Sequence, residues 1–156
     1  MTRKRTPRRI WLPVPPRGLR PLLACDQVRD LSLVHNVNLD SIATGQADEA
    51  TLWQTVAGAL TWSRIADRLG LGEDEMAMQL HMLEGVVQRY SRSGKVGFTG
   101  TEYQLAKRGV LVQDELARIV DRHTAVEAAE WSEQRVNQMS AACARRGCEG
   151  VKAHGC

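Results

Sequence analysis

The chain has 156 residues, of which 43% are hydrophobic and 25% are charged, as is ordinary for one soluble globular domain. No apolar run approaches the roughly 20 residues of a membrane-spanning helix, so we expect neither a membrane protein nor a membrane partner. The net charge of +3 is unevenly divided. Residues 1–20 hold seven of the 21 basic residues and no acidic residue. Residues 21–156, which we call the body, hold the other 14 basic residues and all 18 acidic ones, so the net charge of the body is −4.

Residues 1–21 are predicted to form a flexible, disordered arm. All five prolines of the chain lie there, and they favour an extended polyproline II conformation. We expect the arm to contact nucleic acid or another anionic partner; the alternative is a solvated tail that only aids solubility. The candidate contact residues are Arg3, Lys4, Arg5, Arg8, Arg9 and Trp11, the last by stacking on a base.

The segment Leu22-Leu23-Ala24-Cys25 imitates a bacterial lipobox in which Cys25 would be the lipidated residue. The stretch before it, residues 10–21, is broken by four prolines and two arginines. It therefore lacks the continuous apolar segment of an export signal. We expect a cytoplasmic protein in which Cys25 lies at the start of a helix.

Residues 22–139 are predicted to form an all-α domain of about four helices packed mainly antiparallel, because no proline interrupts them. The second helix is expected over Glu49–Leu69, with Asp48 as its N-cap, and the third over Glu73–Ser93. After the second helix, Gly70 should adopt a left-handed conformation and Leu71 should pack back onto the helix.

The first helix is expected from Leu22 to Thr44. Its apolar stripe contains His35 and Asn38, which would then fix the helix register or line a site. In the favoured alternative the buried face is rotated, so that Val34 and Leu39 enter the core and His35 lies at its edge.

A glycine-rich hinge, Gly94–Gly109, is predicted to reverse the chain between the third and fourth helices. Either Thr99 with Glu102 or Thr101 with Gln104 would start the fourth helix through a capping box. The hinge is also a candidate binding surface, although Phe98 is expected to plug the end of the bundle. The candidate loop residues are Lys95, Gly97, Phe98, Thr99 and Gly100.

The fourth helix is expected to continue to about Met139. Its predicted apolar stripe contains Leu105, Val112, Leu116, Ile119 and Val126, and also Gly109, where another backbone could approach closely. Residues 140–156 are small and glycine-rich, so a flexible, disordered tail is predicted there.

That tail carries the residue types of a Cys₃His zinc site: Cys143, Cys148, His154 and Cys156. Their spacing lacks the close Cys-x₂-Cys pair that anchors a zinc knuckle. We therefore expect a reduced tail and no metal or other cofactor, with a zinc module as the weaker alternative.

Residues 62–83 resemble the helix-turn-helix of bacterial transcriptional regulators in their turn at Gly70 and their apolar spacing. The recognition helix would, however, open with Glu73, Asp74 and Glu75, whose charges oppose contact with phosphates. A helix-turn-helix regulator is thus the alternative to two packed bundle helices.

Catalytic signatures are absent from the sequence: there is no nucleophile elbow, Walker loop, His-Glu-x-x-His or dinucleotide fingerprint. We expect a non-enzymatic interaction protein without a small-molecule substrate. Its partner, protein or nucleic acid, is not identified by the sequence, and a homo-oligomer stays open.

Two further stretches carry a resemblance over roughly residues 1–120. Asn38–Gly45 with the following Trp53, and Arg89–Gly100, resemble small proteins of proteobacterial prophages and other mobile elements. Those proteins also begin with a basic arm like that of Thr2–Arg5. The resemblance implies an accessory protein of a mobile element and no assigned activity.

Overall fold

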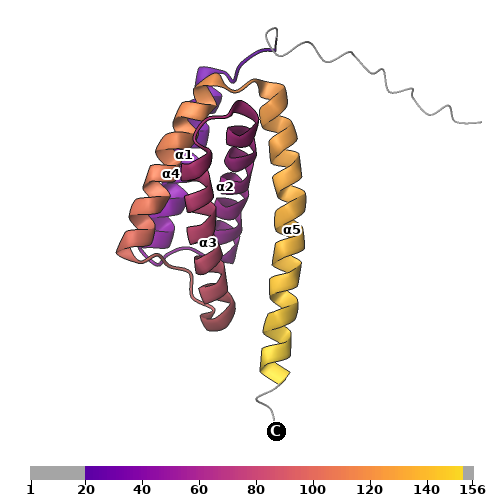
Figure 1. The fold of residues 1–156 in the computed structure, drawn as a ribbon. Helices are drawn as coiled ribbons and strands as arrows, with labels where there is room; N and C mark the ends of the chain where they lie inside the picture. Colours follow the sequence, from indigo (N-terminus) through magenta and orange to yellow (C-terminus); the bar gives the residue numbers. More distant parts are fainter. Residues whose placement is uncertain (1–19, 153–156) are drawn as a thin grey trace, which may run out of the picture.

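The computed structural model describes residues 20–152, and over that range the chain is helical apart from its turns and one isolated β-bridge. Consecutive helices alternate in direction; α1 to α4 form a bundle, and α5 runs alongside it (Figure 1). The all-α class is therefore confirmed, but the helices number five rather than about four. They are α1 (Cys25–Ala43), α2 (Glu49–Leu69), α3 (Glu73–Ser93), α4 (Gly100–Ile119) and α5 (Arg122–Lys152).

Helix α2 is the centre of the packing, because in the described structure it touches all four other helices. Helices α1 and α3 flank it within the bundle, and α5 runs antiparallel along its outer side (Figure 1). Its buried residues accordingly spread over a wide face: Leu52, Trp53, Val56, Ala59, Trp62, Ile65 and Ala66.

The predicted bounds of α2 and α3 are confirmed. The Asp48 carboxylate caps α2 by accepting hydrogen bonds from the Thr51 backbone N–H (2.8 Å) and hydroxyl (2.7 Å). Gly70 ends α2 with φ at 67°, in the left-handed region where glycine carries no steric penalty. The Leu71 backbone N–H donates back to the Ala66 carbonyl (3.2 Å), and the Leu71 side chain is 51% exposed.

Helix α1 begins at Cys25, as the reading of Cys25 at a helix start predicts, and not at Leu22. Leu39 is buried as expected, but the prediction for Val34 is wrong, since this side chain is 52% exposed. The half-buried His35 instead lines a small pocket together with Asn38. The inner face of α1 is therefore the stripe that contains these two polar residues.

The single fourth helix expected to reach Met139 is wrong, because the chain breaks between α4 and α5. Val120 is extended, with φ at −75° and ψ at 138°. Asp121 then starts α5 by accepting hydrogen bonds from the Thr124 backbone N–H (2.9 Å) and hydroxyl (2.6 Å). Helix α5 also continues as far as Lys152, so most of the tail expected to be disordered is helical.

The core consists of two hydrophobic clusters along the bundle. One surrounds Trp53 and Leu83, and the other surrounds Trp62 and Ile65 at the end where the arm joins. Gln79 of α3 and Gln113 of α4 are both buried. Along its own helix, each is preceded by residues of one cluster and followed by residues of the other. The apolar core is thus divided by a polar layer.

The two glutamines of this layer are joined by a hydrogen bond, and one of them also bonds to the backbone of α4. Gln113 donates its side-chain amide to the Gln79 oxygen (2.8 Å), and Gln79 donates to the backbone carbonyl of Ala106 (3.2 Å). The Gln79 side chain occupies the space beside Gly109, where a Cβ would collide with its amide. The absence of a side chain at Gly109 therefore makes room for the Gln79 side chain. The sequence had predicted the close approach of another backbone there instead.

Candidate functional site

The last residues of the arm are attached to the turn between α4 and α5. The Arg122 backbone N–H donates to the Pro21 carbonyl (2.9 Å), and Leu22 forms an antiparallel bridge with Asp121. Arg20 places its guanidinium 3.8 Å from the Asp121 carboxylate. We call this contact between residues 20–22 and 121–122 the arm root.

Asp121 connects the arm root to α5. Burial acts to raise the pKa of Asp121, but the hydrogen bonds from Thr124 and the charge of Arg20 outweigh burial and lower it. The carboxylate therefore stays ionised at neutral pH, where it both caps α5 and attracts the arm. One buried side chain thus fixes the start of a helix and the point from which the basic arm departs.

Several other arginines lie around the arm root. Arg122 is exposed on the first turn of α5, and Arg118 is 64% exposed on α4, where it pairs with Glu115 at 3.0 Å. Arg68 of α2 donates two hydrogen bonds, of 2.8 and 2.7 Å, to Glu127 of α5. The Arg68 hydrogen bond lowers the pKa of Glu127 to about 2. Most of these charges are balanced locally, so the body adds little positive charge to that of the arm.

The six arm residues predicted to contact an anion, from Arg3 to Trp11, lie outside the described residues. What the structure adds is the place where the arm begins, which the sequence did not reveal. The only local sequence signal of a helix start at this turn was Asp121 with Thr124 three residues later. The same spacing occurs at Asp48 and Thr51, where α2 starts.

The predicted loop surface is mainly a structural connection. Thr99 and Glu102 form the capping box of α4, which decides between the two registers left open by the sequence. Glu102 also accepts two hydrogen bonds from Arg89 of α3 (2.8 and 2.7 Å), and Phe98 packs against the larger core cluster. Of the candidate loop residues, Lys95, Thr99 and Gly100 are exposed, and Gly97 and Phe98 are half-buried.

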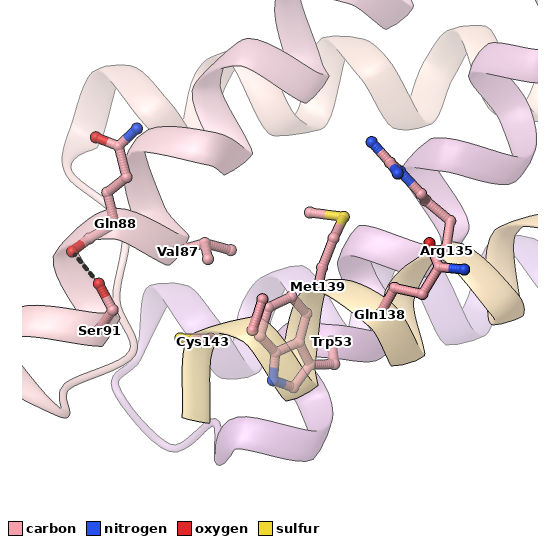
Figure 2. A pocket seen from close by; sticks show the side chains of 9 residues that line it. Trp53, Val87, Gln88, Ser91, Arg135, Gln138, Met139 and Cys143 are labelled. Atoms are coloured by element: carbon pink, nitrogen blue, oxygen red, sulfur yellow. Dashed lines mark hydrogen bonds between the residues drawn. The ribbon is translucent and has the colours of Figure 1, made fainter. Parts of the chain in front are cut away.

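A groove of about 270 Å³ lies between α3 and the middle of α5, with Trp53 of α2 among its lining residues. Figure 2 shows Trp53 and Met139 at its centre, with Val87 and Gln88 on the α3 side and Arg135 and Gln138 on α5. Small-molecule pockets usually measure about 300–1,000 Å³. The groove therefore has room for one or two side chains, and Arg135 supplies a charge at its rim.

Of the four metal candidates, Cys143 is the one whose side chain the structure describes. Among the described residues, no three His, Cys, Asp or Glu side chains are placed to hold a metal ion. Cys143 is half-buried and lines the α3–α5 groove, whereas the side chains of Cys148, His154 and Cys156 lie outside those described, so the zinc module stays a prediction. Over residues 20–152, none of the helices combines the length and apolarity needed to cross a bilayer.

The two helices read as a helix-turn-helix, α2 and α3, lie side by side along their length (Figure 1). In a helix-turn-helix the two helices cross at roughly 90–120°, and the second projects into the major groove. Helix α3 instead buries Met76, Met82 and Val86 within the bundle. This geometry does not favour a recognition role for α3.

His35 is half-buried inside the bundle, and its pKa is displaced from the ordinary value. Its ring lies edge-on to Trp62, with the ring centres 6.2 Å apart, and Gly58 leaves it room. Burial lowers the pKa of His35, and the charge of Asp114 only partly offsets this. The imidazole is therefore neutral in the folded protein at neutral pH and resists protonation.

This burial predicts a pH-dependent stability. Because the pKa of His35 is lower in the folded than in the unfolded chain, its contribution is present above about pH 6.5 and is lost as the pH falls through the folded pKa. Urea unfolding at pH 7.5 and 5.5 should show this loss in the native chain and a smaller one in His35→Gln. His81→Gln, at a side chain that is 90% exposed, should behave like the native chain. Equal pH dependence in His35→Gln and the native chain would contradict the assignment.

Residues 20–152 thus form an all-helical unit of five helices, and six of the seven basic residues of the arm precede it in the sequence. Compared with protein-family models, curated proteins and solved structures, the chain matches none.

Proposed function

We propose that the protein is a non-enzymatic interaction protein that contacts nucleic acid through its basic arm. The arm root is the observation that supports this proposal. Contacts of Arg20, Pro21 and Leu22 to the α4–α5 turn hold the start of the arm at one end of the bundle. The chain therefore enters the body at a defined position, and the other six basic residues of the arm precede that position in the sequence.

The distribution of charge favours the arm as the contact. It carries seven basic residues and no acid, whereas the rest of the chain sums to −4. Lysine and arginine contacts to phosphates provide most of sequence-independent nucleic-acid binding. An acidic body repels the same phosphates, so the binding energy must come from Arg3, Lys4, Arg5, Arg8 and Arg9, with stacking by Trp11.

No observation of the structure favours the alternative, a helix-turn-helix regulator read through residues 62–83. The cytoplasmic location, the mobile-element setting and homo-oligomerisation stay predictions from the sequence.

Binding of a fluorescent mixed-sequence 20-nucleotide single strand tests the proposal. Five phosphate contacts predict that the affinity of the native chain falls roughly a hundredfold between 50 and 200 mM salt. Replacing Arg3, Lys4, Arg5, Arg8 and Arg9 by Gln should remove most of the binding at low salt. The matched control, Lys107→Gln with Arg108→Gln on the exposed face of α4, should keep it. Sequence-selective, salt-resistant binding that survives the arm substitutions would instead support the regulator.

A further inference from the structure

An apolar groove of about 460 Å³ lies on the outer side of α4, against the turn between α2 and α3. Three large side chains along it are open to solvent: Leu71 is 51% exposed, Leu111 66% and Ile119 49%. Val112 and Leu116 complete its apolar lining, and Glu115 is its one charged lining residue. A continuous apolar surface of this kind usually has an occupant.

The groove lies within reach of the arm. Ile119, at one end, is two residues from Asp121 of the arm root, and Leu111 lies eight helical residues further, about 12 Å away. The nine residue-to-residue steps from Trp11 to Arg20 span about 28 Å if the chain is extended. The chain between the arm root and Trp11 is thus long enough to place Trp11 anywhere along the groove.

The chemistry of the arm matches that of the groove. The arm contains Ile10-Trp11-Leu12, with Arg8 and Arg9 directly before it and Arg17 after it. The groove is followed at Gly72 by Glu73, Asp74 and Glu75, and no Lys or Arg occurs between Leu69 and Gln88. Apolar side chains in the groove would therefore place the flanking arginines near the carboxylates of Glu73, Asp74 and Glu75.

We infer that the Ile10–Leu12 segment occupies this groove of its own chain when no nucleic acid is bound. The effect of this docking on nucleic-acid affinity rests on the proposed function, whereas the docking itself does not. When the arm is docked, its basic residues lie near the acidic first turn of α3. A nucleic acid must then displace the arm, so docking lowers the apparent affinity by the fraction of time that the arm is docked.

The docking is tested by photo-crosslinking in the full chain, without nucleic acid, with Trp11→benzoylphenylalanine. Irradiation should yield crosslinked monomer, and peptide mass spectrometry should locate the crosslinks at residues 71–72 and 111–119. Crosslinks at other sites, none at all, or crosslinks between two chains would overturn the inference, the last in favour of exchange between copies. The outcome does not depend on whether the protein binds nucleic acid.

A second measurement tests the competition. Leu111→Gln with Ile119→Gln should abolish the groove crosslinks and raise affinity for the 20-nucleotide strand about threefold, if the arm is docked about two-thirds of the time. Both side chains are exposed, so the fold should be retained, as circular dichroism can verify. Leu33→Gln on α1, 61% exposed and outside the groove, should change neither measurement. Unchanged crosslinks in the double variant would contradict docking. Lost crosslinks with unchanged affinity would contradict only the competition.

Discussion

Gly109→Ala should lower the free energy of unfolding by about 2 kcal/mol, although alanine is the better helix former. A Cβ at this position collides with the buried amide of Gln79. To move away, that amide must give up its hydrogen bonds to Gln113 and to the Ala106 carbonyl. Overpacking costs about 1–3 kcal/mol and an unsatisfied buried polar group a similar amount, of which the gain in helix propensity recovers about 1 kcal/mol.

Gly85→Ala is the matched control. Gly85 lies within α3, and a Cβ there would meet no atom within 4 Å. The substitution should raise the free energy of unfolding by about 0.5–1 kcal/mol, because only the helix-propensity gain remains. Urea unfolding of both variants provides the comparison. If the two alanines had the same effect, the steric explanation for Gly109 would be wrong.

Asp121→Ala should also be costly, with a loss of about 2–3 kcal/mol. The substitution removes the N-cap of α5, leaves the buried Thr124 hydroxyl without its acceptor and removes the carboxylate that attracts Arg20. Loss of an N-cap costs about 0.5–2 kcal/mol, and an unpaired buried hydroxyl about 1 kcal/mol or more.

The chain contains its own comparison in Asp48, which caps α2 through Thr51 with nearly the same two distances, 2.8 and 2.7 Å. Asp48 is exposed, so water can replace the lost acceptor, and Asp48→Ala should cost clearly less than Asp121→Ala. Thermal unfolding of the two variants measures the difference. Equal losses would mean that burial adds nothing to the role of Asp121.

Local sequence signals predicted the middle of the fold well. The bounds of α2 and α3 were correct because Asp48, Gly70 and Gly94 act through nearest neighbours, and their preferences need no tertiary contact. The capping box of Thr99 and Glu102 was also recognisable, although the sequence alone could not choose it over the next register.

The break at Asp121 was missed because no glycine or proline marks it. The predicted stripe through Ile119 and Val126 continued smoothly across the break, yet these two side chains are 49% and 48% exposed. Helix α4 has apolar residues on more than one face, so periodicity alone could not show which face is buried. Its inner face, with Gly109 and Gln113, contains the residues with the weakest hydrophobic signal.

The sequence predicted the charged residues of the candidate site but not the contact that anchors them to the body. The concentration of arginines in the arm can be read directly from the sequence. The arm root joins Leu22 to Asp121 and Pro21 to Arg122, which are far apart in the chain, so no local pattern reports the contact. The apolar groove beside Ile119 was hidden for the same reason, since α4 and the α2–α3 turn form it together.

The pairing of α2 with α5 affects how the chain folds while the ribosome synthesises it. The Thr61 and Ser132 hydroxyls, 2.6 Å apart, and the Arg68–Glu127 pair both join helices separated by α3 and α4. A ribosome adding about 5–20 residues per second needs roughly 3–10 s to synthesise the 50 or so residues between α2 and the start of α5. For that time the outer side of α2 lacks its cover on the nascent chain, and it is there that a chaperone would have reason to bind.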